Sequence, residues 1–238
     1  MSDRRVIDQE VSGQFVSSAP VADLATVPFW KRALDISCLL LMTPLLLPLL
    51  AFIAITIKAG SKGPLLFRQE RVGLHGRRFT LLKFRTMVEG CDTTVHEAHV
   101  ANLMATDRPM VKLDAKGDER LIPFARPLRA SGLDELPQLI NVLRGEMSLV
   151  GPRPCLPNEY ERLLPWQRER VRTLPGLTGL WQVSGKNRTT FSEMIDLDIR
   201  YVREKSLWLD LKILLKTVPA VMAEAWSIGC TGRSRKDR

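Results

Sequence analysis

The sequence has few of the residues on which several common kinds of site depend. Only 6% of its 238 residues are aromatic and no known nucleic-acid-binding module is visible, so nucleic acid is not expected as a partner, even at a net charge of +9. Its three histidines suggest no Ser-His-Asp arrangement. The four cysteines form no CxxC pair, which excludes a disulfide framework and a zinc knuckle and predicts reduced thiols in a cytosolic compartment.

A short polar segment with His96, Glu97 and His99 resembles a metal motif superficially. Its spacing differs from the i, i+4 pair of histidines that binds zinc on a protease helix. The segment also lies within a charged stretch, residues 88–120, which we interpret as a surface excursion. No metal site is expected there.

The chain does contain a long apolar segment. Residues Ile36 to Ile57 form a run of 22 residues without a charge. About 20 apolar residues can cross the core of a bilayer, so a purely soluble globular protein is not expected. A mixed-charge leader precedes the run and no small-residue cleavage site follows it, so we do not interpret it as a signal peptide.

Two prolines interrupt this apolar segment. Pro44 and Pro48 each remove a backbone donor and are expected to kink a helix, while the Thr43 hydroxyl could bond a carbonyl that they free. Basic residues flank the segment on both sides: Lys31, Arg32, Lys58, Lys62, Arg68 and Arg71. We expect them to bind anionic lipid and to favour the cytoplasm for both ends. A helix that bends and returns fits these observations, but prolines also occur in spanning helices, so the spacing leaves both interpretations open.

The rest of the chain has the patterns of a small α/β domain. Strands are predicted at 65–67 and 79–84 around a turn at 73–76. Helices are predicted at 134–144, 158–172, 191–205 and 207–226. The domain organisation predicted from these patterns is a flexible leader at 1–28, a membrane helix at 29–62, a domain at 63–228 and a basic tail at 229–238.

The predicted helices differ in character. The helix 134–144 carries one apolar stripe, made of Leu136, Leu139, Ile140 and Leu143. The charged helix 158–172 is of the surface kind, and the helix 207–226 suits an interfacial or a core position equally. The Gly-rich loop 175–187 is neither a P-loop nor a GxGxxG motif, and we interpret it as an ordinary loop.

The strongest candidate for chemistry is the acidic pair Asp134-Glu135. Such a pair at a helix start commonly has no role beyond stabilising the N-terminus of the helix. Here several cations accompany it: Lys83, Arg85, Arg126, Arg129 and Arg153. Cations hold phosphate oxygens, and a carboxylate can attack phosphorus or bind Mg²⁺. The set therefore indicates phosphate chemistry, although sequence distance leaves the convergence of these residues open.

Several motifs, in this order along the chain, resemble the bacterial sugar transferase family, the monotopic phosphoglycosyl transferases. They are Lys31-Arg32-Ala33-Leu34-Asp35, Phe67-Arg68-Gln69-Glu70-Arg71-Val72-Gly73, Lys83-Phe84-Arg85-Thr86-Met87, Leu133-Asp134-Glu135-Leu136-Pro137-Gln138, Ser148-Leu149-Val150-Gly151-Pro152-Arg153-Pro154 and Pro175-Gly176-Leu177-Thr178-Gly179-Leu180-Trp181-Gln182-Val183. The resemblance covers nearly everything from Lys31 to Trp226. The chain resembles the short form of the family, which has no additional N-terminal membrane domain.

The resemblance implies a fold and a location. The fold is a mostly helical α/β membrane-associated domain with an N-terminal re-entrant membrane helix, interfacial amphipathic helices and a small catalytic α/β core. The location is the cytoplasmic face of the bacterial inner membrane. The family usually has Ser-Pro at the break in the helix, whereas this chain has Thr43-Pro44, whose hydroxyl can make the same backbone bond.

The resemblance also implies an enzyme with a covalent mechanism. Asp134 would attack the β-phosphate of a UDP-sugar and release UMP, and undecaprenyl phosphate would then take the phosphosugar. Asp134 and Glu135 would share a Mg²⁺ ion, with Glu135 as its main ligand. The residues matched to the phosphates or the substrate are Lys83, Arg85, Arg129, Arg153 and Gln182.

Other interpretations make different predictions. A membrane-anchored basic scaffold would bind an anionic partner without catalysis, and a spanning helix would place the two flanks on opposite faces. The motifs resemble members that begin exopolysaccharide synthesis with glucose or galactose, and an apolar C-terminal helix could support a homodimer. The sequence does not identify the sugar.

Overall fold

The computed structural model describes residues 27–88, 94–109, 120–185 and 188–233, without the side chains of 94–97 and 222–233. Helices dominate, with two small sheets. The α-helices are α1 Phe29–Gly60, α2 Thr94–Thr106, α3 Ala125–Ser131, α4 Gln138–Arg144, α5 Pro157–Glu161, α6 Leu180–Val183, α7 Phe191–Glu204 and α8 Leu207–Arg233. The 3-10 turns are η1 Leu74–Gly76, η3 Leu133–Glu135 and η4 Gln167–Arg172. The strands are β1 Leu66–Val72, β2 Arg78–Phe84, β3 Ser148–Val150 and β4 Gly176–Thr178.

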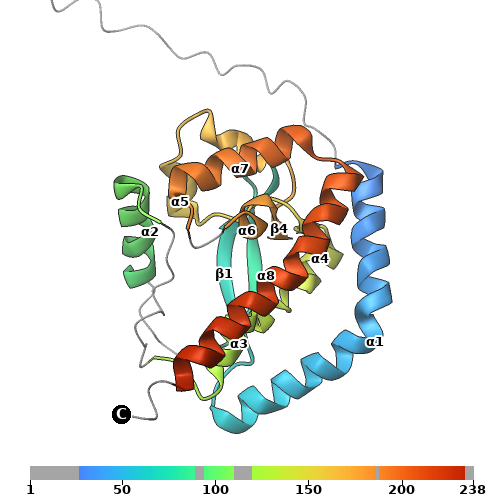
Figure 1. Cartoon of the computed structure of the whole chain (residues 1–238), viewed down its shortest axis with the longest axis vertical. Coiled ribbons are helices and arrows are strands. Elements are labelled where there is room, and N and C mark those ends of the chain that lie inside the picture. The colour runs from blue at the N-terminus through green and yellow to red at the C-terminus, as the bar shows by residue number, and fades with distance from the viewer. Residues whose placement is uncertain (1–26, 89–93, 110–119, 186–187, 234–238) are drawn as a thin grey trace, which may run out of the picture.

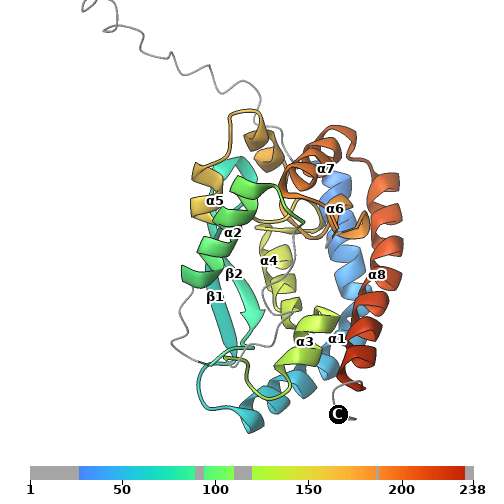
Figure 2. The same ribbon diagram turned by 60° about the vertical axis from the view of Figure 1, so that its left-hand side comes forward.

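The two sheets have different topology. β1 and β2 form an antiparallel hairpin closed by η1, with Leu66 opposite Phe84 and Val72 opposite Arg78. The strand predicted at 79–84 corresponds to β2, but β1 extends to Val72, beyond the predicted 65–67. β3 and β4 pair in parallel, and the sequence analysis did not predict them. In Figure 2, α4 lies between the hairpin on one side and α1 with α8 on the other, so α4 is central to the fold.

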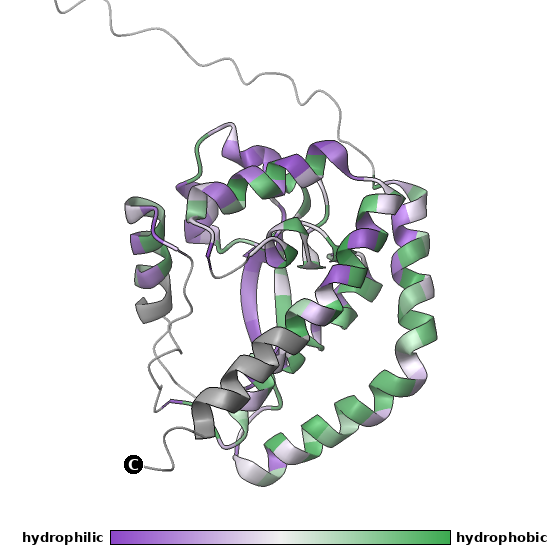
Figure 3. Ribbon diagram, viewed as in Figure 1, coloured by the Kyte–Doolittle hydropathy of each residue, from purple (hydrophilic) through white to green (hydrophobic). Residues whose placement is uncertain are grey.

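The helix α1 is long and apolar enough to cross a membrane by length and composition. Figure 1 shows it as two arms that meet at an angle, and Figure 3 shows mainly hydrophobic residues along it. Pro44 and Pro48 lie inside the helix, where each removes a backbone hydrogen bond. The Thr43 hydroxyl donates to the carbonyl of Leu39 at 2.7 Å, not to a carbonyl that a proline frees.

One side of α1 packs against the rest of the protein along both arms. Leu39 belongs to an apolar cluster with Val142 of α4 and Ile213 of α8. Ile53 and Ile57, on the second arm, belong to a different cluster with Phe84, Ile122, Ala125 and Leu128. The opposite side exposes large apolar residues: Leu40, Leu41, Met42, Leu45, Leu47, Phe52 and Ile55. So large an apolar surface is typical of a membrane-binding face.

The predicted amphipathic helix 134–144 differs from the structure in its start and in its buried face. It divides into the turn η3 and the helix α4, and Ile140 and Leu143 are 39% and 54% exposed. Asn141 is buried instead, because its amide accepts from Leu82 N at 3.2 Å and donates to Thr80 O at 2.8 Å. These bonds satisfy the outer edge of β2, a requirement that apolar periodicity does not reveal.

Two other predicted segments also differ. The prediction of a continuous surface helix at 158–172 is wrong. The shorter elements α5 and η4 lie there instead, and both Glu159 and Arg170 are buried in an ionic network. The polar excursion 88–120 contains the helix α2, which buries Val100 and Leu103.

The prediction that the basic flanks of the apolar segment bind lipid is wrong for Lys31 and Arg71, which are buried. Lys31 Nζ bonds Asp210 Oδ2 at 2.6 Å, Val150 O at 2.7 Å and the Tyr201 hydroxyl at 2.8 Å. The partners lie more than 100 residues away, so no local pattern indicates them. The helix at 191–205 is confirmed as α7, and the helix at 207–226 as the first part of α8.

Candidate active site

The acidic pair lies in the turn η3, between α3 and α4. Gly132 ends α3 with a φ of 69°, in the left-handed region that favours glycine, and turns the chain into Leu133-Asp134-Glu135. Asp134 is 7% exposed, whereas the Glu135 side chain is 39% exposed. The pair is therefore held on a tight turn and not on the first turn of a long helix.

Lys83 of β2 reaches this turn. Its Nζ atom is 2.7 Å from Glu135 Oε1, and its side chain is 25% exposed. An ammonium group has three donors, and this contact with Glu135 is the one that Lys83 makes within the described residues. Lys83 thus presents spare donors beside the carboxylate pair.

Arg129 and Arg85 lie on segments that neighbour the acidic turn. Arg129 Nη1 donates to the hydroxyl of Thr86 at 3.2 Å, and its helix α3 contacts η3. Arg85 is buried, and its guanidinium donates to the carbonyls of Lys62 at 2.7 Å and Ser61 at 3.1 Å. Arg85 therefore holds the end of α1 to the domain, a contact that the sequence analysis did not foresee.

Arg153 enters from the loop after β3. Its Nη1 atom contacts both carboxylate oxygens of Glu159, at 3.1 and 3.0 Å, and its side chain is 18% exposed. Glycines make the position of this loop possible, because a Cβ atom on Gly176 would lie 2.0 Å from Gly151 N, and one on Gly179 would lie 2.2 Å from Gly151 O. The Gly-rich loop thus serves close backbone packing under Arg153.

Gln182 lies in α6, beside the same loop. A Cβ atom on Gly179 would be 2.8 Å from its Oε1 atom, which is buried and has no hydrogen bond within the described residues. Gln182 thus lies next to the Arg153 loop, and within the described residues no hydrogen bond joins it to another predicted site residue.

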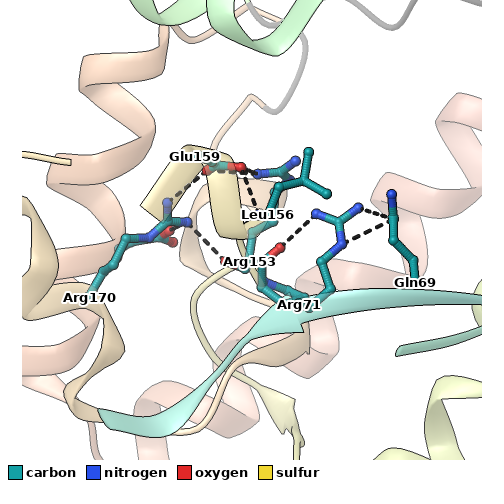
Figure 4. A network of polar contacts seen from close by, with 8 residues as sticks. Gln69, Arg71, Arg153, Leu156, Glu159 and Arg170 are labelled. Atoms are coloured by element: carbon teal, nitrogen blue, oxygen red, sulfur yellow. Dashed lines mark hydrogen bonds and ion pairs between the residues drawn. The ribbon is translucent and has the colours of Figure 1, made fainter. Parts of the chain in front are cut away.

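Arg71 of β1 lies beside the loop that carries Arg153. It is buried, and it donates to Pro154 O at 3.0 Å and to Gln69 Oε1 at 2.6 Å (Figure 4). Burial and the nearby Arg153 lower the pKa of Arg71 to about 10, while the carboxylates of Glu159 and Glu135 oppose this shift. Arg71 therefore ties β1 to the Arg153 loop through Pro154 O and adds positive charge beside that loop.

An ionic network behind Arg153 was missed by the sequence analysis. Glu159 bridges Arg153 and Arg170, and Arg170 bonds Asp198 of α7 at 2.5 Å. Burial raises the pKa of Asp198 to about 6, and Arg170 only partly offsets this. The excess of arginine was visible in the sequence, but no spacing linked these acids to particular arginines.

Within the described residues, no group of three or more His, Cys, Asp or Glu side chains could hold a metal ion. The acidic pair can still supply one or two carboxylates. Mg²⁺ is commonly bound by one or two carboxylates together with substrate phosphates and water. The donor set therefore fits a magnesium ion that takes most of its ligands from the substrate.

Comparison with known proteins identifies related chains. Residues 26–224 match the family model described as bacterial sugar transferase. The UDP-glucose:undecaprenyl-phosphate glucose-1-phosphate transferase of Caulobacter vibrioides is 42% identical over 91% of this chain and 79% of its own length. The exopolysaccharide production protein ExoY of Sinorhizobium fredii is 38% identical over 80% of this chain and 84% of its own length. The undecaprenyl-phosphate galactose phosphotransferase of Salmonella typhimurium is 37% identical over 82% of this chain, which spans only 40% of that protein.

Proposed function

Because this chain belongs to the bacterial sugar transferase family, we propose that it transfers a hexose-1-phosphate from a UDP-sugar to undecaprenyl phosphate and releases UMP. The observation that carries the proposal is the acidic turn at Asp134 and Glu135, with the Lys83 ammonium 2.7 Å from Glu135. This reaction would be the first membrane step in the synthesis of an exopolysaccharide or another glycoconjugate.

The proposed mechanism has two displacements at one phosphorus atom. A carboxylate oxygen of Asp134 attacks the phosphorus that carries the sugar, a P–O bond to Asp134 forms, and the P–O bond to UMP breaks. An oxygen of undecaprenyl phosphate then attacks the same phosphorus, the bond to Asp134 breaks, and the carboxylate is restored. The covalent intermediate lets a soluble donor and a membrane-bound acceptor react in separate encounters.

The surrounding cations lower the barrier to the first attack. A diphosphate repels an anionic carboxylate, so positive charge must offset the phosphate charge before the two approach. Lys83 and Arg153 would bind phosphate oxygens with the donors that they do not use within the protein, and Arg129 and Arg85 would add positive charge nearby. Gln182 would contact the nucleotide or the sugar.

Glu135, with Asp134, would hold Mg²⁺. When bound, this ion would neutralise charge on the diphosphate. Glu135 would also orient the phosphate, and its contact with Lys83 fixes its carboxylate beside Asp134.

We also propose that α1 re-enters the membrane and that the catalytic core lies on the cytoplasmic face of the inner membrane. Both arms of α1 pack on one α/β body, through Leu39 on the first arm and through Ile53 and Ile57 on the second. Beyond the second arm, Arg85 binds the carbonyls that follow the helix. A spanning helix would separate its ends by the bilayer thickness of about 30 Å, which is difficult to reconcile with these contacts.

The test of catalysis is UMP release from a UDP-sugar, with undecaprenyl phosphate and Mg²⁺. Asp134→Asn should abolish UMP release, because an amide cannot act as the nucleophile. Asp196→Asn is the matched control, since Asp196 is an exposed residue of α7, and it should leave the rate unchanged. Retention of UMP release by Asp134→Asn would refute the covalent mechanism. A wild-type protein that released no UMP from any donor would favour the scaffold interpretation.

The sugar is proposed to be glucose or galactose, the sugars in the names of the relatives from Caulobacter and Salmonella. A panel of UDP-sugars in the same assay tests this. Activity with N-acetylated sugars alone would refute the assignment.

A further inference from the structure

Glu159 occupies a buried position between two arginines. Its Oε1 atom is 3.1 Å from Arg153 Nη1 and 3.2 Å from Arg170 Nη1, and its Oε2 atom is 3.0 Å from the same nitrogen of Arg153 (Figure 4). Oε2 also accepts from Leu156 N at 3.3 Å, which fixes the carboxylate to the start of α5. The carboxylate therefore has a partner on each side and little freedom to move.

The charge state of Glu159 follows from its surroundings. Burial disfavours its ionised form, but the guanidinium groups of Arg153, Arg170 and Arg71 together hold its pKa at about 2. Glu159 is therefore a carboxylate at neutral pH. A buried charge-assisted pair of this kind fixes geometry more strongly than an exposed one.

The network holds the backbone of Arg153 as well as its side chain. Arg170 Nη2 donates to the backbone carbonyl of Arg153 at 3.0 Å. Arg170 is itself bonded to Asp198, and both side chains are buried. The contacts that run from α7 through η4 to the loop after β3 thus hold both the backbone and the side chain of Arg153.

The hydrogen bonds of Arg153 within the described residues leave two of its nitrogens unused. Within the described residues, its hydrogen bonds all use Nη1, and neither Nε nor Nη2 is a buried unpaired atom. A guanidinium has five N–H donors in a rigid planar fork. Fixing one nitrogen therefore fixes the direction of the donors that remain for an anion.

We propose that Glu159 is a positioning residue that orients the guanidinium of Arg153 toward the diphosphate of the sugar donor. This inference rests on the proposed function. Ordering an arginine side chain costs a large amount of conformational entropy. Glu159 orders the side chain of Arg153 before substrate binds. The ion pair between Glu169 and Arg203, whose side chains are 21% and 66% exposed, includes neither Glu159 nor Arg153 and provides a comparison in the same region of the chain.

The test is a double-mutant cycle with the UMP-release assay on full-length protein. Glu159→Gln should lower kcat/KM for the UDP-sugar by about 10- to 100-fold, the loss expected from a misplaced binding group. Arg153→Ala should lower it at least as much. The double variant should match Arg153→Ala, because Glu159 acts through Arg153. Glu169→Gln is the matched control and should leave kcat/KM unchanged.

The outcomes separate the inference from the proposed function. If the effects of Glu159→Gln and Arg153→Ala multiply in the double variant, or if Glu159→Gln is as active as wild type, the positioning role is wrong while the function stands. If wild type releases no UMP, both are overturned. Should Glu159→Gln not fold, Glu159→Asp keeps the charge and shortens the side chain by one methylene, and the same cycle applies. Failure of both variants to fold would assign Glu159 to the fold alone and overturn the inference.

Discussion

Replacing Lys31 by methionine should destabilise the whole domain strongly. Lys31 is fully buried at the start of α1, where its ammonium contacts Asp210, Val150 O and Tyr201 within 2.8 Å. In Lys31→Met the Asp210 carboxylate would stay buried and would keep the Tyr201 hydroxyl, 2.7 Å from Oδ1, as its neutral partner. Breaking a buried pair from one side costs about 3–5 kcal/mol, because the other charge is left without compensation.

That cost can be measured as a change in melting temperature. A domain of this size shifts by about 2–4 °C for each kcal/mol, so Lys31→Met should lower Tm by roughly 6–20 °C. The assay is thermal unfolding of detergent-solubilised protein, followed by near-UV circular dichroism. Lys58→Met is the matched control, because Lys58 lies at the other end of α1 and is exposed, and its one hydrogen bond in the described part of the chain is to Gly63 O at 2.8 Å. It should change Tm by less than about 4 °C.

A double variant tests the physical reason. Lys31→Met with Asp210→Leu removes both charges and leaves Tyr201 able to donate to Val150 O, 3.2 Å away. It should recover a large part of the Tm lost in Lys31→Met, since apolar side chains can replace a buried ion pair with little loss. A single variant as stable as Lys58→Met, or a double variant less stable than Lys31→Met, would refute the reasoning.

Two further predictions concern packing and pH. Gly176→Ala should destabilise the fold by about 1–3 kcal/mol, because its Cβ would lie 2.0 Å from Gly151 N. Gly60→Ala should have little effect, because its Cβ would meet Pro123 at an ordinary 3.6 Å, and thermal unfolding compares the two variants. Glu159 has a folded pKa of about 2 against an ordinary value of 4.5, so its ionisation contributes about 3 kcal/mol above pH 4.5, and this contribution is lost as the pH falls toward 2. The difference in unfolding free energy between wild type and Glu159→Gln, measured by urea unfolding, should therefore shrink as the pH falls from 5 to 2.5. A difference that stays constant would contradict the lowered pKa of Glu159.

Those parts of the fold that depend on local pattern were predictable. Two strands around a turn were predicted from two short apolar runs and a glycine turn, and β1 and β2 form there, although β1 extends to Val72, past the predicted 65–67. The helix α7 follows from its periodicity, and Thr190 with Glu193 forms a capping box at its start. In these segments the residues that determine the structure are neighbours in the sequence, so periodicity is sufficient.

The parts that depend on distant partners were not predictable in the same way. Asn141 is buried because β2 needs a hydrogen-bonding partner along its outer edge, 59 and 61 residues away. The stripe of Leu136, Leu139, Ile140 and Leu143 would satisfy a helix on an apolar core, but two of its members face outward here. The contact of Lys83 with Glu135 also spans 52 residues, and the sequence left open whether Lys83 and the acidic pair come together.

The basic residues show why composition alone could not locate the site. A net charge counts every cation equally, whereas the structure separates them by how many of their donors are already used. Lys31 and Arg170 are buried, and their charged groups are surrounded by protein acceptors, so they cannot serve a ligand without losing the fold. Lys83 and Arg153 are partly exposed, and each is fixed by one carboxylate. A cation held on one side and open on the other is what binding a diphosphate requires, because the protein contact sets its direction and the remaining donors meet the anion. This distinction, which needs the fold, supports the proposal that Lys83 and Arg153 bind the substrate, whereas Lys31 stabilises the fold.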